Sequence, residues 1–565
     1  MTSPEFMQSD ERNTTEAGFA GWAAASTADA FLQTGRAPMG RHVAGDGFLA
    51  GLAQHASGAP IIGFGDPRER EPFIARIRAT GSDARVGFID HRFPERLAGP
   101  GHLITHAPDL AHRAWHRTRR APGGYSVIGV THSLSGTIVR EAICAMSTAP
   151  VALHDALVCT SRAAHGVVTR LIEAQEEDLR RRLGATRFPR PQLPIIPLGV
   201  ETASFSPQDS QNRELRARER ERLGLSGDDL MILSVGRLDP LSKAWPMPLL
   251  VALSRVESTR RIKLVMAGSS PPGPGPGGSD GAQSISAHLQ DTARAIDPRL
   301  DLVVRPDLSA PDLRSVYAAA DVFAAMSDNI QETFGLAVIE AMAAGLPVVV
   351  SDWSGYRDLV REAIDGFLVP TRMPPESFSE RVAGLHEAQQ IGYREYAGAV
   401  SALTVVDVDT CADRIGALAA DPELRARMGE AARARAVQQY DWAVVIGQYR
   451  ALIDACAERR AAGSSVRFAA PAHPSPFGLF GEFASKRLEM TTMVAPGEAD
   501  LIKTARLQPM PLGAYCGAEA VTIMARLGSE PMPLQALLGR CRDIDPGRVT
   551  ATVMALSKIG ALRLS

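Results

Sequence analysis

The sequence contains no apolar run long enough to cross a membrane. Its uninterrupted apolar stretches stay well short of the roughly 18 residues that a membrane-spanning helix requires. The N-terminus has no basic segment followed by an apolar core, so no secretory signal is predicted. We therefore expect a cytoplasmic protein that either stays in solution or associates peripherally with the inner face of the membrane.

Cysteine is also scarce, and the two signs of charge nearly balance. The six cysteines are spread along the chain, and no two of them form a CxxC pair. This spacing argues against a structural zinc site or a disulfide framework and is typical of small apolar residues in a reducing compartment. The formal net charge of −2 gives no electrostatic reason to expect nucleic acid as a partner.

The first part of the chain alternates short apolar runs with helical patterns. The 565 residues are enough for about two to four domains, and residues 1–29, polar and alanine-rich, are expected to form a disordered tail. Strands that alternate with helices predict a parallel sheet. The expected strands fall within residues 30–35, 60–64, 85–90, 101–108, 125–132 and 156–161.

A second series of the same kind follows a linker rich in proline and glycine at residues 193–207. Its expected strands fall within residues 229–240, 262–270, 299–309, 320–328, 346–352 and 365–371. The fold class is therefore α/β, with two Rossmann-like domains that face a cleft.

The stretch "NIQETFGLAVIEAMAAG" carries two glutamates, Glu332 and Glu340, just after an expected strand. Ligands of open α/β sheets gather there, and the free N–H groups of residues 334–336 at the start of a helix suit a diphosphate. A carboxylate would repel phosphate, so we expect Glu332 to accept hydrogen bonds from sugar hydroxyls. Glu340 lies about two turns further on, within an apolar helix, and a ribose diol would give it two donors. The alternative is two exposed helix charges.

A second candidate site is "VGRLDPLSKAW". A strand ends at Val235–Gly236, and Arg237 and Lys243 follow in the loop. Two cations at this end of a strand could neutralise the same diphosphate. The alternative is that both side chains are solvated loop charges.

Together these segments resemble the retaining glycosyltransferases of family 4, the group 1 glycosyltransferases. The resemblance covers about residues 30–460 and implies the GT-B fold. It implies an acceptor domain at 30–200, a nucleotide-sugar domain at 201–439 and a final helix at 440–460 that crosses back onto the first domain. The segments that carry it are "IPLGVETASFSP", "SVGRLDPLSK", "LVMAGSS", "YAAADVFAAMSDNIQETFGLAVIEAMAAGLPVVVSDWSGYRDLV", "DGFLVP" and "YDWAVVIGQYRALI".

The resemblance also implies roles for single residues. Glu332 would contact the donor sugar and Glu340 the ribose, while Arg237 and Lys243 would stabilise the leaving diphosphate. His132, which follows an expected strand in "GVTHSLSG", would lie near the donor sugar, or would otherwise be a structural histidine. The remaining donor contacts would come from the loop Gly40–Gly47 through Gly45, from Gly236, from the amides of Phe334, Gly335 and Leu336, and from the main chain at Val304 and Arg305.

The reaction implied is transfer of a hexosyl unit, with retention, from a nucleotide-diphosphate sugar such as a UDP-, GDP- or ADP-sugar. The acceptor would be a hydroxyl of a glycan, a lipid-linked sugar or a protein, as in polysaccharide biosynthesis. The resemblance implies no cofactor and no metal, and we interpret the aspartates of "DVDTCAD" (407–413) as a helix cap. The alternatives are a sugar-nucleotide-binding protein without catalysis and another GT-B enzyme, a phosphorylase or an epimerase.

Residues 466–565 lie outside the resemblance. Their last part, 532–565, is predicted to form a helix, a turn, a helix and a short strand, which resembles a winged helix-turn-helix. The region holds 11 Lys and Arg against 8 Asp and Glu, too small an excess to predict DNA binding. We expect either a module that contacts a protein or recruits the acceptor, or an appendage that packs on the enzyme.

Overall fold

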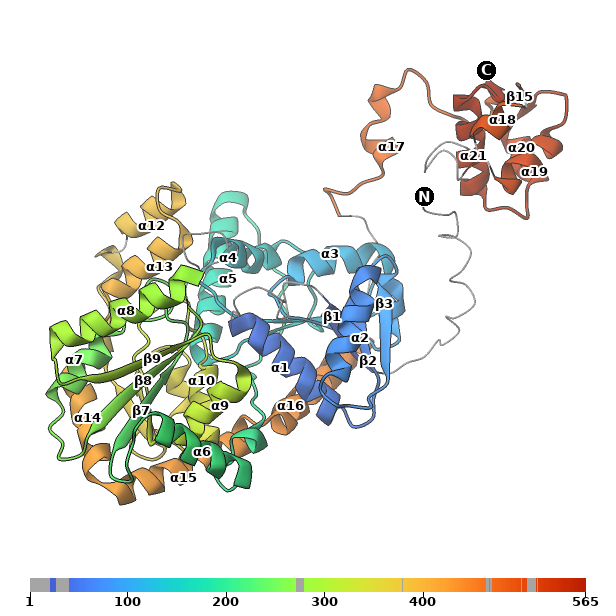
Figure 1. Cartoon of the computed structure of the whole chain (residues 1–565). Helices are drawn as coiled ribbons and strands as arrows, with labels where there is room; N and C mark the ends of the chain where they lie inside the picture. Colours follow the sequence, from blue (N-terminus) through green and yellow to red (C-terminus); the bar gives the residue numbers. More distant parts are fainter. Residues whose placement is uncertain are drawn as a thin grey trace. The chain divides into compact units, whose positions relative to one another are not determined.

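The computed structural model describes residues 21–26, 40–270, 279–378, 380–463, 467, 470–498, 500–505, 515 and 517–565. The chain divides into two compact units, Met1–Ala470 and Pro471–Ser565 (Figure 1). Within the described residues, no helix is both long and apolar enough to span a bilayer.

The first half of the larger unit is built on a parallel sheet with the strand order β3-β2-β1-β4-β5-β6. The strands are β1 (Trp22–Ser26), β2 (Ile61–Gly65), β3 (Val86–Asp90), β4 (His102–Thr105), β5 (Ser126–Val130) and β6 (Ala156–Val158). Strands β2 to β6 confirm the predicted runs. The run at 30–35 lies outside the described residues.

Strand β1 corrects the prediction of a disordered tail over residues 1–29. All five of its residues, Trp22–Ser26, are buried, and it pairs with both β2 and β4 in the interior of the sheet. Its sequence, "WAAAS", was misread because alanine has little strand preference. A strand covered on both faces needs apolar residues rather than an alternating pattern, and alanine satisfies that requirement.

Helices cover both faces of this sheet, and each face has its own core. One core includes residues of α1 and of α16, a helix from the far end of the unit (Figure 1). The helices of the first half are α1 (Gly40–His55), α2 (Arg70–Arg78), α3 (Leu110–Arg120), α4 (Thr137–Cys144) and α5 (Arg162–Leu183).

The second half repeats the architecture, with the parallel strand order β12-β11-β10-β7-β8-β9. The strands are β7 (Leu230–Val235), β8 (Ile262–Gly268), β9 (Asp301–Pro306), β10 (Val322–Ala325), β11 (Val348–Ser351) and β12 (Gly366–Val369), and each confirms a predicted run. The helices are α6 (Ser210–Arg222), α7 (Met247–Arg255), α8 (Ser279–Ile296), α9 (Ala310–Ala319), α10 (Leu336–Ala343), α11 (Tyr356–Leu359), α14 (Val408–Ala420) and α15 (Pro422–Gln439).

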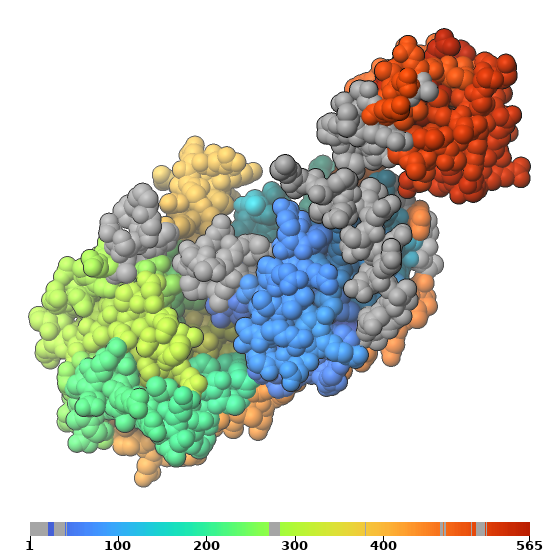
Figure 2. Space-filling model, turned by 45° about the vertical axis from the view of Figure 1, so that its right-hand side comes forward, coloured from blue at the N-terminus to red at the C-terminus, as the bar shows by residue number. Residues whose placement is uncertain are grey.

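Two further helices interrupt the second half after its last strand. Short strands β13 (Thr371–Arg372) and β14 (Val405–Val406) pair antiparallel and close the base of the interruption. Between them lie α12 (Glu380–Glu387) and α13 (Tyr393–Ala402). We call residues 373–404 the α12–α13 insert; in the space-filling view it is a gold projection on the surface (Figure 2).

Helix α16 (Trp442–Ala462) crosses back onto the first half, as predicted for the final helix. Its first residue, Trp442, is buried and packs edge-on against Phe48 of α1 at a centroid distance of 6.1 Å. The interdomain linker passes so close that a Cβ on Gly199 would lie 2.5 Å from the Trp442 indole. Trp442 thus opens a row of α16 side chains that are buried in the core of the first half, and Gly199 makes room for it.

The smaller unit is a three-stranded antiparallel sheet covered by helices around one core. The predicted pattern of helix, helix and strand at its end is present as α20, α21 and β17, whereas the winged-helix assignment stays a prediction. Its elements are α17 (Pro476–Leu479), β15 (Met493–Pro496), α18 (Leu501–Ala505), α19 (Ala518–Leu527), β16 (Met532–Pro533), α20 (Leu534–Arg540), α21 (Pro546–Lys558) and β17 (Leu562–Leu564).

Replacing Trp442 by alanine should loosen the attachment of α16 to the first half. Removal of a buried aromatic side chain from a closed core costs about 3–5 kcal/mol, because a cavity replaces the lost contacts. We expect Trp442→Ala to lower the free energy of unfolding by this amount in chemical denaturation. Glu458→Ala, on an exposed position of the same helix, should change it by less than about 0.5 kcal/mol. Equal values for the two variants would contradict the structural role of Trp442.

Candidate active site

The loop after β7 is folded around a buried carboxylate. Asp239 is 3% exposed and accepts hydrogen bonds from Ser242 Oγ (2.6 Å) and from Arg394 Nη2 (3.1 Å). Burial would raise the pKa of Asp239, but the hydrogen bonds from Ser242 and Arg394 hold it below its usual value. The amide of Lys243 donates to the main-chain oxygen of Asp239 (2.9 Å), so the same residue determines where Lys243 leaves the loop.

Arg237 begins this loop and contacts neutral groups. Its Nη1 donates to Ser242 Oγ (3.2 Å). With the Gln331 amide turned so that both of its ends are satisfied, Arg237 Nη2 donates to Gln331 (2.8 Å). Burial lowers the pKa of Arg237, but a guanidinium remains charged in proteins. Its positive charge is therefore held in place, partly removed from water.

Lys243 and Glu332 form an ion pair that joins the two loops singled out in the sequence. Lys243 Nζ lies 2.5 Å from Glu332 Oε2, with side chains 31% and 8% exposed. Burial would raise the pKa of Glu332, but the Lys243 charge and hydrogen bond hold it below its usual value. The pair brings the two predicted sites together and excludes the alternative of separate solvated charges for Lys243 and Glu332.

The turn after Glu332 needs glycine where the chain enters α10. Gly335 has φ = +120°, and a Cβ there would lie 2.5 Å from the Tyr356 ring, so only glycine fits. The Phe334 amide donates to Glu332 Oε1 (3.2 Å). Ser161 Oγ, from the first half, donates to the Thr333 carbonyl oxygen (2.7 Å). The turn that opens α10 is thus held from both halves of the unit.

Glu340 has a buried partner that the sequence analysis missed. The hydroxyl of Tyr317, on α9, donates to Glu340 Oε2 (2.7 Å). Burial, only partly offset by this hydrogen bond, raises the pKa of Glu340 to about 7. The alternative of an exposed helix charge is wrong for this residue. Tyr317 is the first residue of the quoted segment "YAAADVF". Its spacing in the sequence did not indicate that its hydroxyl would bind Glu340.

The ends of β7, β8 and β9 meet closely beside this site. Gly268, at the end of β8, has φ = +153°, and a Cβ there would lie 1.8 Å from the Gly236 carbonyl oxygen. Ala267 and Gly268 pair in register with Arg305 and Pro306 of β9. The predicted donor contacts Gly236, Val304 and Arg305 therefore lie at the same edge of the sheet.

The Arg305 side chain is engaged away from this edge, and the predicted donor contact of its main chain stays a prediction. Its guanidinium donates to Glu219 on α6 (2.8 Å), and the two side chains are 15% and 7% exposed. The side chain is therefore committed to packing α6 against the sheet.

The first half contributes the loop between β5 and α4, with His132 in it. His132 lies two residues beyond β5, and the next residues, Ser133 and Ser135, reach Tyr393 of the second half. The loop that carries His132 therefore faces the second half, and the expected place of His132 near the donor sugar stays a prediction.

The predicted loop Gly40–Gly47 is wrong. These residues form the first turns of α1, which begins at Gly40. An amide five residues into a helix is bonded within the helix, so the Gly45 N–H is not available to a diphosphate. The spread of glycines suggested a turn, but α1 packs against Trp442, and a Cβ on Gly47 or Gly51 would lie only about 3 Å from the indole ring. These glycines serve helix packing.

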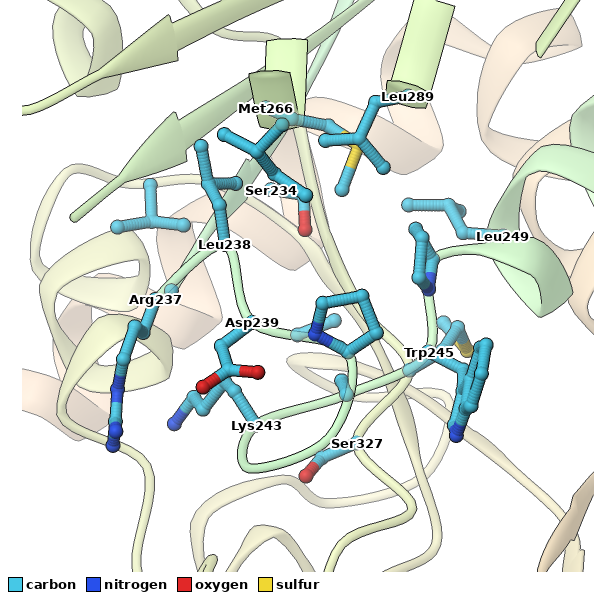
Figure 3. A pocket seen from close by; sticks show the side chains of 18 of the residues that line it. Ser234, Arg237, Leu238, Asp239, Lys243, Trp245, Leu249, Met266, Leu289 and Ser327 are labelled. Atoms are coloured by element: carbon cyan, nitrogen blue, oxygen red, sulfur yellow. The ribbon is translucent and has the colours of Figure 1, made fainter. Parts of the chain in front are cut away.

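A small pocket lies beneath the loop after β7. Its volume of about 60 Å³ is far below the roughly 300–1,000 Å³ of typical ligand pockets. Arg237, Asp239 and Lys243 lie toward one end of it, and Met266 and Leu289 toward the other (Figure 3). A nucleotide sugar would therefore have to lie over the strand ends rather than inside this pocket.

Among the aspartates of residues 407–413, Asp407 caps a helix, as predicted. Asp407 accepts a hydrogen bond from the Thr410 amide (3.0 Å) at the start of α14. Across the described parts of the chain, no group of three or more His, Cys, Asp or Glu side chains could hold a metal ion. Transfer without a metal stays a prediction.

Part of the chain, including the site, is similar to known proteins. Residues 216–399 match the family described as "Glycosyl transferases group 1". The chain is 30% identical over 292 residues to a D-inositol 3-phosphate glycosyltransferase of Xylanimonas cellulosilytica, covering 52% of this chain and 55% of the relative. It is 27% identical over 367 residues to the protein so named from Nocardia farcinica, covering 57% and 78%. The chain thus spans about half the length of the first of these relatives.

Among solved structures, Anabaena Alr3699/HepE in complex with UDP and glucose is similar, with a TM-score of 0.49 and 14% identity over 76% of this chain and 99% of that one. A similarity at this level does not extend to function.

Two parallel six-stranded sheets, with the loops of Arg237, Lys243 and Glu332 at the strand ends of one of them, define an α/β protein of the predicted GT-B class. The match to the group 1 glycosyltransferases lies within the second half of the larger unit, which carries Arg237, Lys243, Glu332 and Glu340.

Glu340 should make stability depend on pH. The carboxyl titrates near 4.5 in its ordinary state and at about 7 when folded, so between these values only the folded state holds the proton. Its stabilising contribution is full below pH 4.5 and is lost as the pH rises through 7, at roughly 1.4 kcal/mol per pH unit. Glu340→Gln should remove this slope from thermal unfolding between pH 5 and 8. The exposed-site control Glu430→Gln should keep it, and an unchanged slope in Glu340→Gln would contradict the assignment.

Proposed function

We propose that this protein is a retaining glycosyltransferase that moves a hexosyl unit from a nucleotide-diphosphate sugar to an acceptor hydroxyl. The observation that carries the proposal is the Lys243–Glu332 pair at the start of α10, within the stretch that matches the group 1 glycosyltransferases. A paired cation, a second cation at Arg237 and a helix start at one sheet edge suit a diphosphate.

The phosphate end of the donor would lie between Arg237, Lys243 and the start of α10. When the bond from the anomeric carbon to the phosphate oxygen breaks, negative charge develops on the leaving diphosphate. Fixed positive charge stabilises that change more than it stabilises the bound substrate, because it is already in position when the charge appears. Arg237 is held in this way by Ser242 and Gln331.

Retention follows if the acceptor attacks from the face that the diphosphate leaves. A bond forms between the acceptor oxygen and the anomeric carbon, and the acceptor proton passes to an oxygen of the leaving diphosphate. No protein carboxylate is needed as nucleophile or base. The Lys243 hydrogen bond and the low pKa of Glu332 suit this assignment, since an ionised carboxylate is an acceptor for sugar hydroxyls and not an acid.

The nucleoside end would reach Glu340. A ribose diol supplies two O–H donors to a carboxylate that already accepts from Tyr317. Because the pKa of Glu340 is near 7, diol binding to the ionised form would be accompanied by loss of a proton near neutral pH.

The acceptor is left open among hydroxyl-bearing molecules. The curated relatives are named D-inositol 3-phosphate glycosyltransferases, so D-inositol 3-phosphate belongs in the acceptor panel beside glycans, lipid-linked sugars and protein.

A donor screen tests the proposal directly. The full chain is incubated with UDP-, GDP- and ADP-sugars, and donor hydrolysis and thermal shift are measured together. We expect at least one donor to raise the melting temperature and to be turned over. Absence of both effects with every donor would refute the proposal.

Substitution at Lys243 tests the phosphate site. Lys243→Ala should reduce transfer by at least about 100-fold, the size of effect seen when one charge-stabilising group is removed. This substitution also leaves the buried Glu332 carboxylate without its cation, which lowers stability. The double variant Lys243→Ala/Glu332→Gln removes that unpaired charge and so separates lost catalysis from lost stability. The double variant should recover the wild-type melting temperature and remain inactive. Near-normal activity in either variant would mean that the phosphate site is elsewhere.

A further inference from the structure

The α12–α13 insert reaches both halves of the larger unit. Helix α12 has no buried residue, whereas α13 buries Ala397, Gly398 and Ser401 against the second half. The short β13–β14 ladder closes the base of the insert. Helix α12 therefore adds little to the core, and the structural role of the insert lies in the contacts of α13.

On one side, α13 supports the loop that carries Arg237 and Lys243. Arg394 donates to the buried carboxylate of Asp239 (3.1 Å), around which that loop is folded. Gly398 lies against Leu241 so closely that a Cβ would approach the Leu241 side chain to 2.8 Å.

The same helix supports the loop that carries Glu332. Ser401 Oγ donates to the buried carboxylate of Asp328 (2.5 Å). Asn329 is fully buried, and its amide donates to the Leu241 carbonyl oxygen (3.0 Å) and to that of Ala397 (3.5 Å). The two loops that hold the Lys243–Glu332 pair are thus tied to each other and to α13.

On the other side, α13 meets the first half at the His132 loop. The Tyr393 hydroxyl is 2.7 Å from Ser135 Oγ and 3.4 Å from Ser133 Oγ. The Arg140 guanidinium of α4 stacks over the Tyr396 ring at 5.8 Å. In the ribbon view α13 and α4 lie near one another, although residues 145–392 separate them in the sequence (Figure 1).

We infer that Tyr393 and Arg394 are positioning residues for the proposed transfer, one for the closure of the two halves and the other for the phosphate loop. Tyr393 ties the second half to the His132 loop, and Arg394 fixes Asp239 and through it Arg237 and Lys243. The inference rests on the proposed function for its reaction. The contacts of Tyr393 and Arg394 from which it is argued are present in the structure without substrate. Adjacent residues on one helix thus join domain closure to the geometry of the phosphate site.

The two residues should affect different kinetic constants. Tyr393→Phe removes only the hydroxyl that meets the serines, so donor KM should change less than about twofold and kcat should fall about tenfold, a loss of roughly 1.4 kcal/mol. Arg394→Ala should raise donor KM about tenfold, because the Asp239 carboxylate loses its cation and the loop that holds Arg237 loosens. Arg394→Lys should recover most of the affinity. Glu395→Ala, an exposed neighbour on the same helix, should match the wild type.

A double-mutant cycle tests whether Tyr393 acts through Ser135. If it does, Ser135→Ala and Tyr393→Phe should each lower kcat, and the double variant should be no slower than either single one. Fully additive losses, or wild-type kcat in Tyr393→Phe, would overturn the inference. Melting temperatures within about 2 °C of wild type would show that the loss is not unfolding.

A measurement without turnover separates this inference from the proposed reaction. Fluorescent labels on an exposed residue of each half report the distance between the halves in the full chain. Tyr393→Phe should widen that distance distribution, and Glu395→Ala should not. If the wild type turns over no donor but Tyr393→Phe still opens the halves, the proposed function fails and the closure role of Tyr393 stands. An unchanged distribution in Tyr393→Phe would overturn the closure role.

Discussion

The Lys243–Glu332 ion pair is the interaction on which the site depends. It joins the loop after β7 to the loop after β10 across the ends of two neighbouring strands. A buried carboxylate without a cation would be strongly destabilising, and a cation without the carboxylate would be free to move. The pair therefore places one positive charge beside the start of α10 and keeps Glu332 ionised, which is the state in which it can receive sugar hydroxyls.

The second constraint is that elements of the site approach each other closely at two glycines, where a side chain would not fit. Gly268 allows the end of β8 to touch the main chain at Gly236, and Gly335 turns the chain into α10 against the Tyr356 ring. Any side chain at either position would separate elements that carry site residues. At both positions the absence of a side chain lets two elements of the site come into contact. The charged side chains of the site project from these elements.

Much of the fold could be predicted from the sequence, because short apolar runs that alternate with helical patterns leave few alternatives to a parallel sheet. The exceptions have physical reasons. "WAAAS" forms β1 although alanine favours helices, since burial on both faces outweighs local preference. The pairing of Glu340 with Tyr317 and of Asp239 with Arg394 joins residues that are far apart in the chain, so no local spacing could reveal it. Gly45 was assigned to a loop because its segment is rich in glycine. In the structure, Gly47 and Gly51 of the same helix make room for Trp442, and sequence alone does not distinguish such glycines from those of a turn.

The α12–α13 insert also explains how the proposed phosphate site can contain two acidic residues. Lys243 balances Glu332, and Arg394, from the insert, balances Asp239. The hydrogen bonds of Arg237 go to the neutral side chains of Ser242 and Gln331, so its charge would be available to a phosphate. Without Arg394, the negative charge of Asp239 would be balanced by the cations of its own loop. The positive potential at the strand ends would then be lower. The helix that ties the two halves together thus also keeps the charge of the site positive.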